Sequence, residues 1–292
     1  MVDVDLGFSR NPTNSGTMGL LSIANKEKVD YKIVDFDYHD DGKGASVADF
    51  RRWVTRGGVV GWVVGERGTG KSEAISRLFL DLIKENPEQP TLPIYISISE
   101  GRLRESVPNS PSGGEGVSMA LFNYACREAL RESLEYIRNK GKGRFFRKMR
   151  KSRALSDERT WQQIMKMLHD DNFSLNDFMD LPDNDMPLCV CLDDLDKFPP
   201  ATVHNFFWKN QTDLQRLSGT HKVSIIGSVE RVFVNEYKGD KSVNWCLPTS
   251  DSKELHIPNL SDLTSSDIQK LIDHRISHLH YNPPLNENES GL

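Results

Sequence analysis

The chain has 292 residues, of which 37% are hydrophobic and 27% are charged, and its formal net charge is −5. This composition is typical of a folded globular protein and excludes an intrinsically disordered chain. The length suits one large α/β domain, or one domain with a smaller partner. The negative net charge argues against a surface generally coated with nucleic acid, but it leaves a local basic patch open.

The apolar runs and the cysteines bear on where the protein resides. No apolar stretch approaches the roughly 20 residues that span a bilayer, and residues 1–12 lack the pattern of a signal peptide. The four cysteines form no C-x-x-C pair, and Cys189 and Cys191 alternate within an apolar run, which is typical of core thiols in a reducing compartment. We therefore expect a cytoplasmic protein without membrane contact.

The N-terminal part of the chain is polar. Residues 1–45 scatter Gly, Asn and Asp among short apolar pieces such as Tyr31–Phe36, which predicts an irregular arm with room for one short strand. A helix is expected from Ser46, a suitable N-cap, to about Thr55, because Arg56-Gly57-Gly58 would end it.

The next stretch carries the most specific motif. An apolar run with β-branched residues, Val59–Val64, leads into Gly65-Glu66-Arg67-Gly68-Thr69-Gly70-Lys71-Ser72, which fits G-x-x-x-x-G-K-[ST]. Glycines let backbone N–H groups turn towards a di- or triphosphate, Lys71 brings positive charge to the β- and γ-phosphates, and the Ser72 hydroxyl can ligate Mg²⁺. The helix expected from Glu73 to Lys84 adds its N-terminus to this phosphate-binding loop. The N-terminal arm either covers the base of the nucleotide or drapes over the surface.

A second strand is expected from Leu92 to Ile98, followed by a Gly-, Pro- and Ser-rich loop over 100–116 and a long helix from Val117 to Arg138. A basic segment without acidic residues begins where that helix ends, and Phe145 and Phe146 lie in its middle. Such a segment can grip a nucleic-acid backbone and stack on bases. Alternatively it belongs to a helical insert, at about 138–186, that is either solvated or paired within the chain with an acidic stretch. The basic residues are Arg138, Lys140, Lys142, Arg144, Arg147, Lys148, Arg150, Lys151 and Arg153, and the acidic ones are Asp170, Asp171, Asp177, Asp180, Asp183 and Asp185.

The second motif follows the run Leu188–Leu192, which has the near-continuous apolarity of a strand buried on both faces of a parallel sheet. Carboxylates at the carboxyl end of such a strand lie where ligands bind. The segment has the form of a Walker B strand, in which Asp193 would hold Mg²⁺ and Asp194 would orient or deprotonate the attacking water.

The rest of the chain predicts a helix over 202–217, a strand over 223–228 and a short strand over 254–257. Ser228 ends the first of these strands and is either a sensor of the γ-phosphate or a simple strand-ending serine. A helix is expected from about Ser266 to Leu279, with Thr264 or Ser265 as its cap.

With these motifs in this order, the chain from about Ala45 to Leu279 resembles the additional-strand P-loop ATPases, the AAA+, STAND and KAP-like group. The Asp193-Asp194-Leu195-Asp196 ending looks more like STAND and KAP ATPases, since AAA+ proteins typically carry Asp-Glu there. The resemblance implies a three-layer α/β P-loop NTPase with a parallel five-stranded sheet of order 5-1-4-3-2. It also implies an oligomer with ATP between subunits.

Several features depart from that group. Membrane-type KAP proteins have transmembrane helices between the two Walker motifs, where this chain has a charged insert. After the fifth strand only one lid-like helix is visible, so residues 261–292 are expected to be the start of a helical lid or a C-terminal extension, and we expect a fragment of a longer protein. Arg275 lies in the region of the lid sensor without a clear assignment, and Arg231 is the candidate for a trans-acting arginine.

The sequence therefore predicts an arm (1–45), a P-loop ATPase domain (46–260) and the lid or extension (261–292). The expected function is a Mg·ATP-hydrolysing oligomeric switch, which by resemblance is a ring-forming scaffold in bacterial antiviral defence with a protein effector. Two alternatives stay open, namely a nucleic-acid-dependent ATPase that uses the basic segment and a nucleotide-binding assembly platform that does not hydrolyse. ATP is preferred over GTP because the chain has no Asn-Lys-x-Asp motif.

Overall fold

The computed structural model describes residues 17–18, 47–67, 69–84, 90–97, 118–139, 144–198, 200–233, 253–257, 265–266 and 269. The P-loop motif apart from Gly68, the apolar strands and most of the basic and acidic segments lie within these ranges. Residues 31–36, Ser46, Gly68, Lys140, Lys142, Thr264 and Arg275 lie outside them, so the expectations attached to these positions stay predictions.

A single mixed sheet forms the centre of the molecule. Its parallel part has the order β3-β4-β5-β2-β6, which is the predicted order 5-1-4-3-2 read from the other edge. The strands are β2 (Val60–Val64), β3 (Leu92–Ser97), β4 (Leu188–Asp193), β5 (Ser224–Val229) and β6 (Lys253–His256). All residues of β2, β4 and β5 are buried, as expected for strands covered on both faces.

The sheet has a sixth strand besides the five predicted for it, and this strand comes from the N-terminal arm, where the sequence left room for one short strand. Strand β1 (Thr17–Met18), from the polar N-terminal region, pairs antiparallel with β3 at the edge of the sheet. Two residues are too short to show a period-2 pattern, which is why the sequence could not place this strand.

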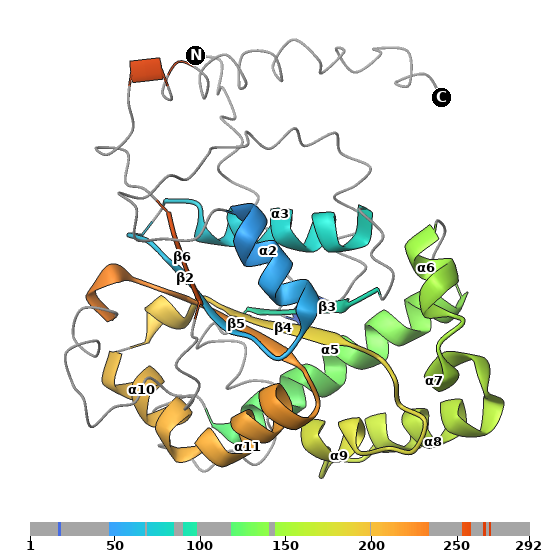
Figure 1. Cartoon of the computed structure of the whole chain (residues 1–292). Helices are drawn as coiled ribbons and strands as arrows, with labels where there is room; N and C mark the ends of the chain where they lie inside the picture. The colour runs from blue at the N-terminus through green and yellow to red at the C-terminus, as the bar shows by residue number, and fades with distance from the viewer. Residues whose placement is uncertain are drawn as a thin grey trace, which may run out of the picture.

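Helices cover both faces of the sheet, giving three layers (Figure 1). Helices α2 (Val47–Arg56) and α3 (Lys71–Lys84) lie on one face, where Phe79 of α3 packs edge-on against Tyr95 at 6.2 Å. Helices α5 (Met119–Asn139), α10 (Pro200–Lys209) and α11 (Gln211–Gln215) lie on the other, where Trp62 and Phe207 have ring centroids 5.0 Å apart. The predicted α/β class and three-layer P-loop architecture are confirmed by the strand order and these layers.

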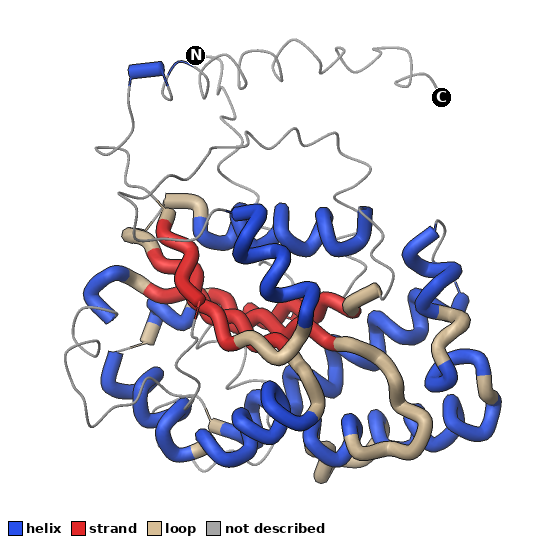
Figure 2. The backbone as a smooth tube through the Cα atoms, in the orientation of Figure 1, coloured by secondary structure: helices blue, strands red, loops and turns tan. Residues whose placement is uncertain are grey.

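Over residues 144–186 the segment expected as an insert forms four helices, which lie beside α5 at one end of the sheet (Figure 2). These are α6 (Arg144–Met149), α7 (Arg153–Ser156), α8 (Glu158–Leu168) and α9 (Leu175–Met179). Asp157 caps α8 by accepting from the Thr160 N–H at 2.8 Å.

The helix predicted over 202–217 is not continuous. It breaks at Asn210 into α10 and α11, and a π-helical turn, Arg216–Thr220, then leads to β5. At the break, the Asn210 side-chain amide donates to the Phe206 carbonyl at 2.7 Å, and the Asn210 N–H donates to the same oxygen at 3.2 Å. In the described part of the chain, no helix is both long and apolar enough to cross a bilayer.

Candidate nucleotide-binding site

The phosphate loop joins the end of β2 to the start of α3. The buried Gly65 N–H donates to the Val229 carbonyl at 3.2 Å, which ties the loop to the end of β5. A Cβ on Gly65 would lie 2.6 Å from the Thr69 hydroxyl oxygen and 3.1 Å from Cβ of Ile257, so a side chain has no room there. Gly70 has φ +95°, a conformation that favours glycine. The loop therefore requires glycine at these two motif positions.

The loop is closed by bonds of its own. The Thr69 hydroxyl donates to the Glu66 carbonyl at 2.9 Å, and the Ala74 N–H begins the helical pattern by donating to the Gly70 carbonyl at 3.0 Å. Glu66 and Arg67 are exposed, whereas Ser72 is half-buried in the first turn of α3.

Lys71 is 6% exposed and turns back over the loop. Its Nζ donates to the carbonyl oxygens of Gly65 and Glu66, at 3.0 Å each, and forms an ion pair with Oδ2 of Asp196 at 2.9 Å. An ammonium group has three N–H donors, and all three have an acceptor from this chain. Sequence reasoning gave Asp196 no role of its own; its place in the acidic run after β4 was the available signal.

The carboxylate of Asp193 is 1% exposed and accepts hydrogen bonds from three groups. Its Oδ1 accepts from the Asp194 N–H at 2.9 Å and from the Ser228 hydroxyl, and its Oδ2 accepts from the Tyr95 hydroxyl. The register brings these groups together, because Leu192 of β4 lies opposite Gly227 of β5, so the next residues of the two strands are neighbours. A role for Ser228 at a γ-phosphate stays a prediction.

Tyr95 is a site residue that the sequence did not reveal, since a single tyrosine in an apolar strand is ordinarily a core residue. Burial raises the pKa of its phenol well above the ordinary value, and the neighbouring Asp193 carboxylate raises that pKa further. The phenol therefore stays protonated at neutral pH and donates to Asp193.

Asp194 begins the turn that carries Asp196. It has φ +66° and lies at the start of the 3-10 turn Leu195–Lys197, and its Oδ2 forms an ion pair with Lys197 Nζ at 2.8 Å. The two carboxylates assigned by the sequence thus have different surroundings. Asp193 is held by neutral donors and the backbone, and Asp194 is held by a cation at the protein surface.

The residues present fit a magnesium-bound nucleotide. The close approach at Gly65 excludes a side chain at that position of the loop, and Lys71 already binds an anionic oxygen, that of Asp196. Lys71 would hold the phosphates, and Ser72 with Asp193 would hold the metal.

Three cations of the basic segment, Arg138, Arg150 and Arg153, contact other parts of the same chain. Arg138 forms an ion pair with Glu158 and lies over the Trp161 ring, 4.5 Å from its centroid. Arg150 donates to the Ile137 carbonyl at 2.8 Å. These contacts agree with the hypothesis of an intramolecularly paired insert.

Farther along the segment, Arg153 pairs with Asp183 of the acidic stretch at 3.3 Å. Phe145 and Phe146 are 2% and 4% exposed and pack edge-on against each other at 5.3 Å. They are core side chains and are not available to stack on bases. The nucleic-acid hypothesis is left with cations, and the exposed ones in the described part of the segment are Arg144, Arg147, Lys151 and Arg153.

Arg231, the candidate trans-acting arginine, lies just after β5. Its Nη2 is 3.5 Å from the Ile257 carbonyl oxygen, at the end of β6 of the same chain. It is thus beside the phosphate loop of its own subunit, and action in trans stays a prediction.

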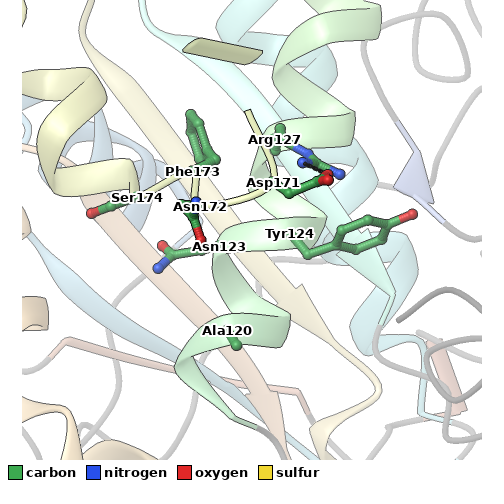
Figure 3. A pocket seen from close by; sticks show the side chains of 8 residues that line it. All are labelled: Ala120, Asn123, Tyr124, Arg127, Asp171, Asn172, Phe173 and Ser174. Carbon is green, nitrogen blue, oxygen red and sulfur yellow. Dashed lines mark hydrogen bonds and ion pairs between the residues drawn. The ribbon is translucent and has the colours of Figure 1, made fainter. Parts of the chain in front are cut away.

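A separate hollow of about 290 Å³ lies between the first half of α5 and the segment before α9 (Figure 3). Arg127 lies 5.0 Å from the Tyr124 ring centroid and pairs with Asp171 at 3.0 Å. None of the lining residues belongs to the phosphate loop or to the ends of β4 and β5. They are Ala120, Asn123, Tyr124, Arg127, Asp171, Asn172, Phe173 and Ser174.

Comparison with known proteins adds distant structural likenesses. No protein-family model and no curated protein sequence matches the chain. Among solved structures, it is similar to the Walker-type ATPase paby2304 of Pyrococcus abyssi (11% identity, TM-score 0.43, covering 82% of this chain and 58% of that one). It is also similar to C. elegans PCH-2 (13% identity, TM-score 0.38, 84% and 48%). The chain spans about half the length of these two proteins, and its own strand order and phosphate loop give it the fold of a P-loop NTPase.

Proposed function

We propose that this chain binds Mg·ATP and hydrolyses it. The observation that carries the proposal is the meeting of Lys71, from the phosphate loop, with the acidic turn that follows the buried strand β4. Phosphate transfer needs a lysine that can hold an anionic oxygen and a carboxylate that can hold the metal, and here these are Lys71 and Asp193, at the end of β4.

Each residue has a proposed task. Lys71 neutralises phosphate charge, Ser72 and Asp193 hold the metal, and Asp194 orients the attacking water or takes its proton. Ser228 and Tyr95 keep the Asp193 carboxylate in place through their hydroxyl groups. The magnesium ion, when bound, supplies positive charge that offsets the charge developing on the phosphate oxygens.

The primary experiment is Mg²⁺-dependent phosphate release from ATP by the purified chain, with Lys71→Ala as the blank. We expect turnover that is lost in Lys71→Ala and falls at least about a hundredfold in Asp194→Asn, the size typical of a general base. Equal rates in the wild type and the Lys71→Ala blank would refute the proposal.

The non-hydrolysing platform is kept as a second candidate because Asp194 is ion-paired with Lys197. A carboxylate oxygen that already accepts from an ammonium group has less capacity left to accept from water. In this case ATP would bind tightly without turnover, and Asp194→Asn would leave both binding and assembly intact.

The finer role is also a proposal. The acidic ending of β4 supports an oligomeric switch of the STAND or KAP type, including a scaffold in antiviral defence with a protein effector. Light scattering with and without Mg·ATP tests this, because a switch requires a nucleotide-dependent increase in mass that Lys71→Ala lacks.

The nucleic-acid-dependent ATPase is supported by the exposed cations Arg144, Arg147 and Lys151. Its test is the same ATPase assay with added single- and double-stranded DNA and RNA. Stimulation that weakens steeply with salt, and that disappears when these three residues are changed to Gln, would make it the leading function.

A further inference from the structure

We propose that Asp196 sets the nucleotide affinity of this site by occupying the place of a phosphate oxygen on Lys71. The proposal rests on the proposed function, since it concerns the same lysine. Oδ2 of Asp196 is 2.9 Å from Lys71 Nζ, and the side chains of Asp196 and Lys71 are only 12% and 7% exposed. The pair is thus shielded from the solvent that weakens exposed ion pairs.

The hydrogen-bond capacity of Lys71 makes Asp196 a competitor of phosphate. Two of its three donors bind the carbonyl oxygens of Gly65 and Glu66, which belong to the loop. The third binds Asp196, so an incoming phosphate oxygen gains a donor only if one of these acceptors leaves. Asp196 is the acceptor that leaves, because its negative charge repels phosphate whereas the carbonyl groups are fixed in the backbone.

The turn that carries Asp196 is anchored independently of Lys71. Leu195 is fully buried, and its Cδ1 lies so near Gly227 that an added Cβ there would be 3.0 Å away. At the other end of the turn, Lys197 pairs with Asp194 at 2.8 Å. Release of Asp196 therefore requires a side-chain rotation and leaves the turn in place.

This competition lowers the apparent affinity for nucleotide. When only a fraction of the protein is in the binding-competent form, the apparent Kd equals the intrinsic Kd divided by that fraction. If the Lys71–Asp196 pair is closed about nine-tenths of the time, its removal strengthens binding about tenfold. Asp196→Asn keeps the shape of the side chain and removes its charge, so it isolates this effect.

The experiment is calorimetric titration of Mg·ATP into the wild type, Asp196→Asn and Asp196→Ala. Asp183→Asn is the matched control, because it removes the same charge from an exposed ion pair, that with Arg153. We expect the Kd for ATP to fall about tenfold in both Asp196 variants and to stay within about twofold in the control. Unchanged or weaker binding in the Asp196 variants would overturn the proposal.

Thermal unfolding gives a second readout and covers a variant that folds poorly. Without nucleotide, Asp196→Asn should melt at a lower temperature than the wild type, since its resting ion pair is lost. With saturating Mg·ATP the difference should shrink, because the pair is open in both proteins. An equal loss of melting temperature in both conditions would show a purely structural role and would overturn the proposal. If no variant, including the wild type, binds ATP better than Lys71→Ala, the proposed function itself fails and this proposal fails with it.

Discussion

The Tyr95 hydroxyl offers a sharp test of the buried end of the site. Tyr95→Phe removes one oxygen atom and keeps the ring, which is 1% exposed and packs on Phe79. What is lost is the hydrogen bond that the Tyr95 hydroxyl donates to the Asp193 carboxylate. Hydrogen bonds to charged groups contribute about 1.5–3 kcal/mol. Because Asp193 would keep two donors, we expect a loss of about 2 kcal/mol in the free energy of unfolding.

Urea unfolding at pH 7 measures this loss. With a denaturant slope of about 3 kcal/mol per M, a loss of about 2 kcal/mol lowers the midpoint by about 0.7 M. Tyr136→Phe is the control, because the Tyr136 ring also packs edge-on against a phenylalanine but is half-buried away from the site. It should change stability by about 0.5 kcal/mol or less.

The result that refutes this reasoning is an unchanged midpoint in Tyr95→Phe. It would mean that Asp193 finds another donor at no cost, and that Tyr95 does not position it. A matching loss in Tyr136→Phe would show that the effect comes from the ring surroundings and not from the carboxylate.

Three further predictions concern packing and pH. Gly227→Ala should cost about 1–3 kcal/mol in urea unfolding, since the new Cβ would lie 2.6 Å from the Trp62 ring; a neutral change would contradict it. Phe145→Ala should cost about 3–5 kcal/mol, whereas Arg147→Ala in the same helix should cost about 0.5 kcal/mol or less, and equal costs would show that Phe145 is not core. Burial raises the pKa of the Cys189 thiol, so above about pH 8.5 the thiol ionises in the unfolded chain and stays protonated in the folded one. The free energy of unfolding is therefore unaffected below that pH and falls above it, by up to about 1.4 kcal/mol per pH unit. Under reducing conditions the unfolding free energy should therefore fall between pH 8 and 10, and less steeply in Cys189→Ala; parallel slopes would contradict this.

The sequence predicted the sheet because its signals were local and strong. The β-branched run before Gly65 and the apolar run before Asp193 identify buried strands, and the order of the two motifs determines their places in a P-loop sheet. The two-residue strand β1 could not be predicted in this way. Its formation depends on the free edge of β3, which is a tertiary fact and leaves no pattern in Thr17 or Met18.

The site was predicted less completely than the fold. The motif identifies Lys71 and Asp193, but the partners of these residues depend on side-chain direction and strand register. Tyr95 reaches Asp193 across the β3–β4 pair, and Asp196 reaches Lys71 from a 3-10 turn, and neither contact follows from spacing along the chain.

In the basic segment, the sequence pattern did not reveal which side chains are buried. Its composition indicated a charged surface, and several of its cations do lie at the surface, but its two phenylalanines fill the space beside α5. The same sequence pattern of charged and aromatic residues occurs in nucleic-acid-binding grooves and in amphipathic helices. Only the packing of the aromatic side chains distinguishes the two.

The contact between Trp62 and Gly227 has a consequence for how this sequence can vary. The indole of Trp62 lies over the neighbouring strand where Gly227 has no side chain. The large residue at position 62 therefore restricts position 227 to glycine. Homologous chains with a small residue at position 62 would be free to carry alanine or valine at position 227. Joint substitution at these two positions, with either single change rare, would be the evolutionary record of this contact.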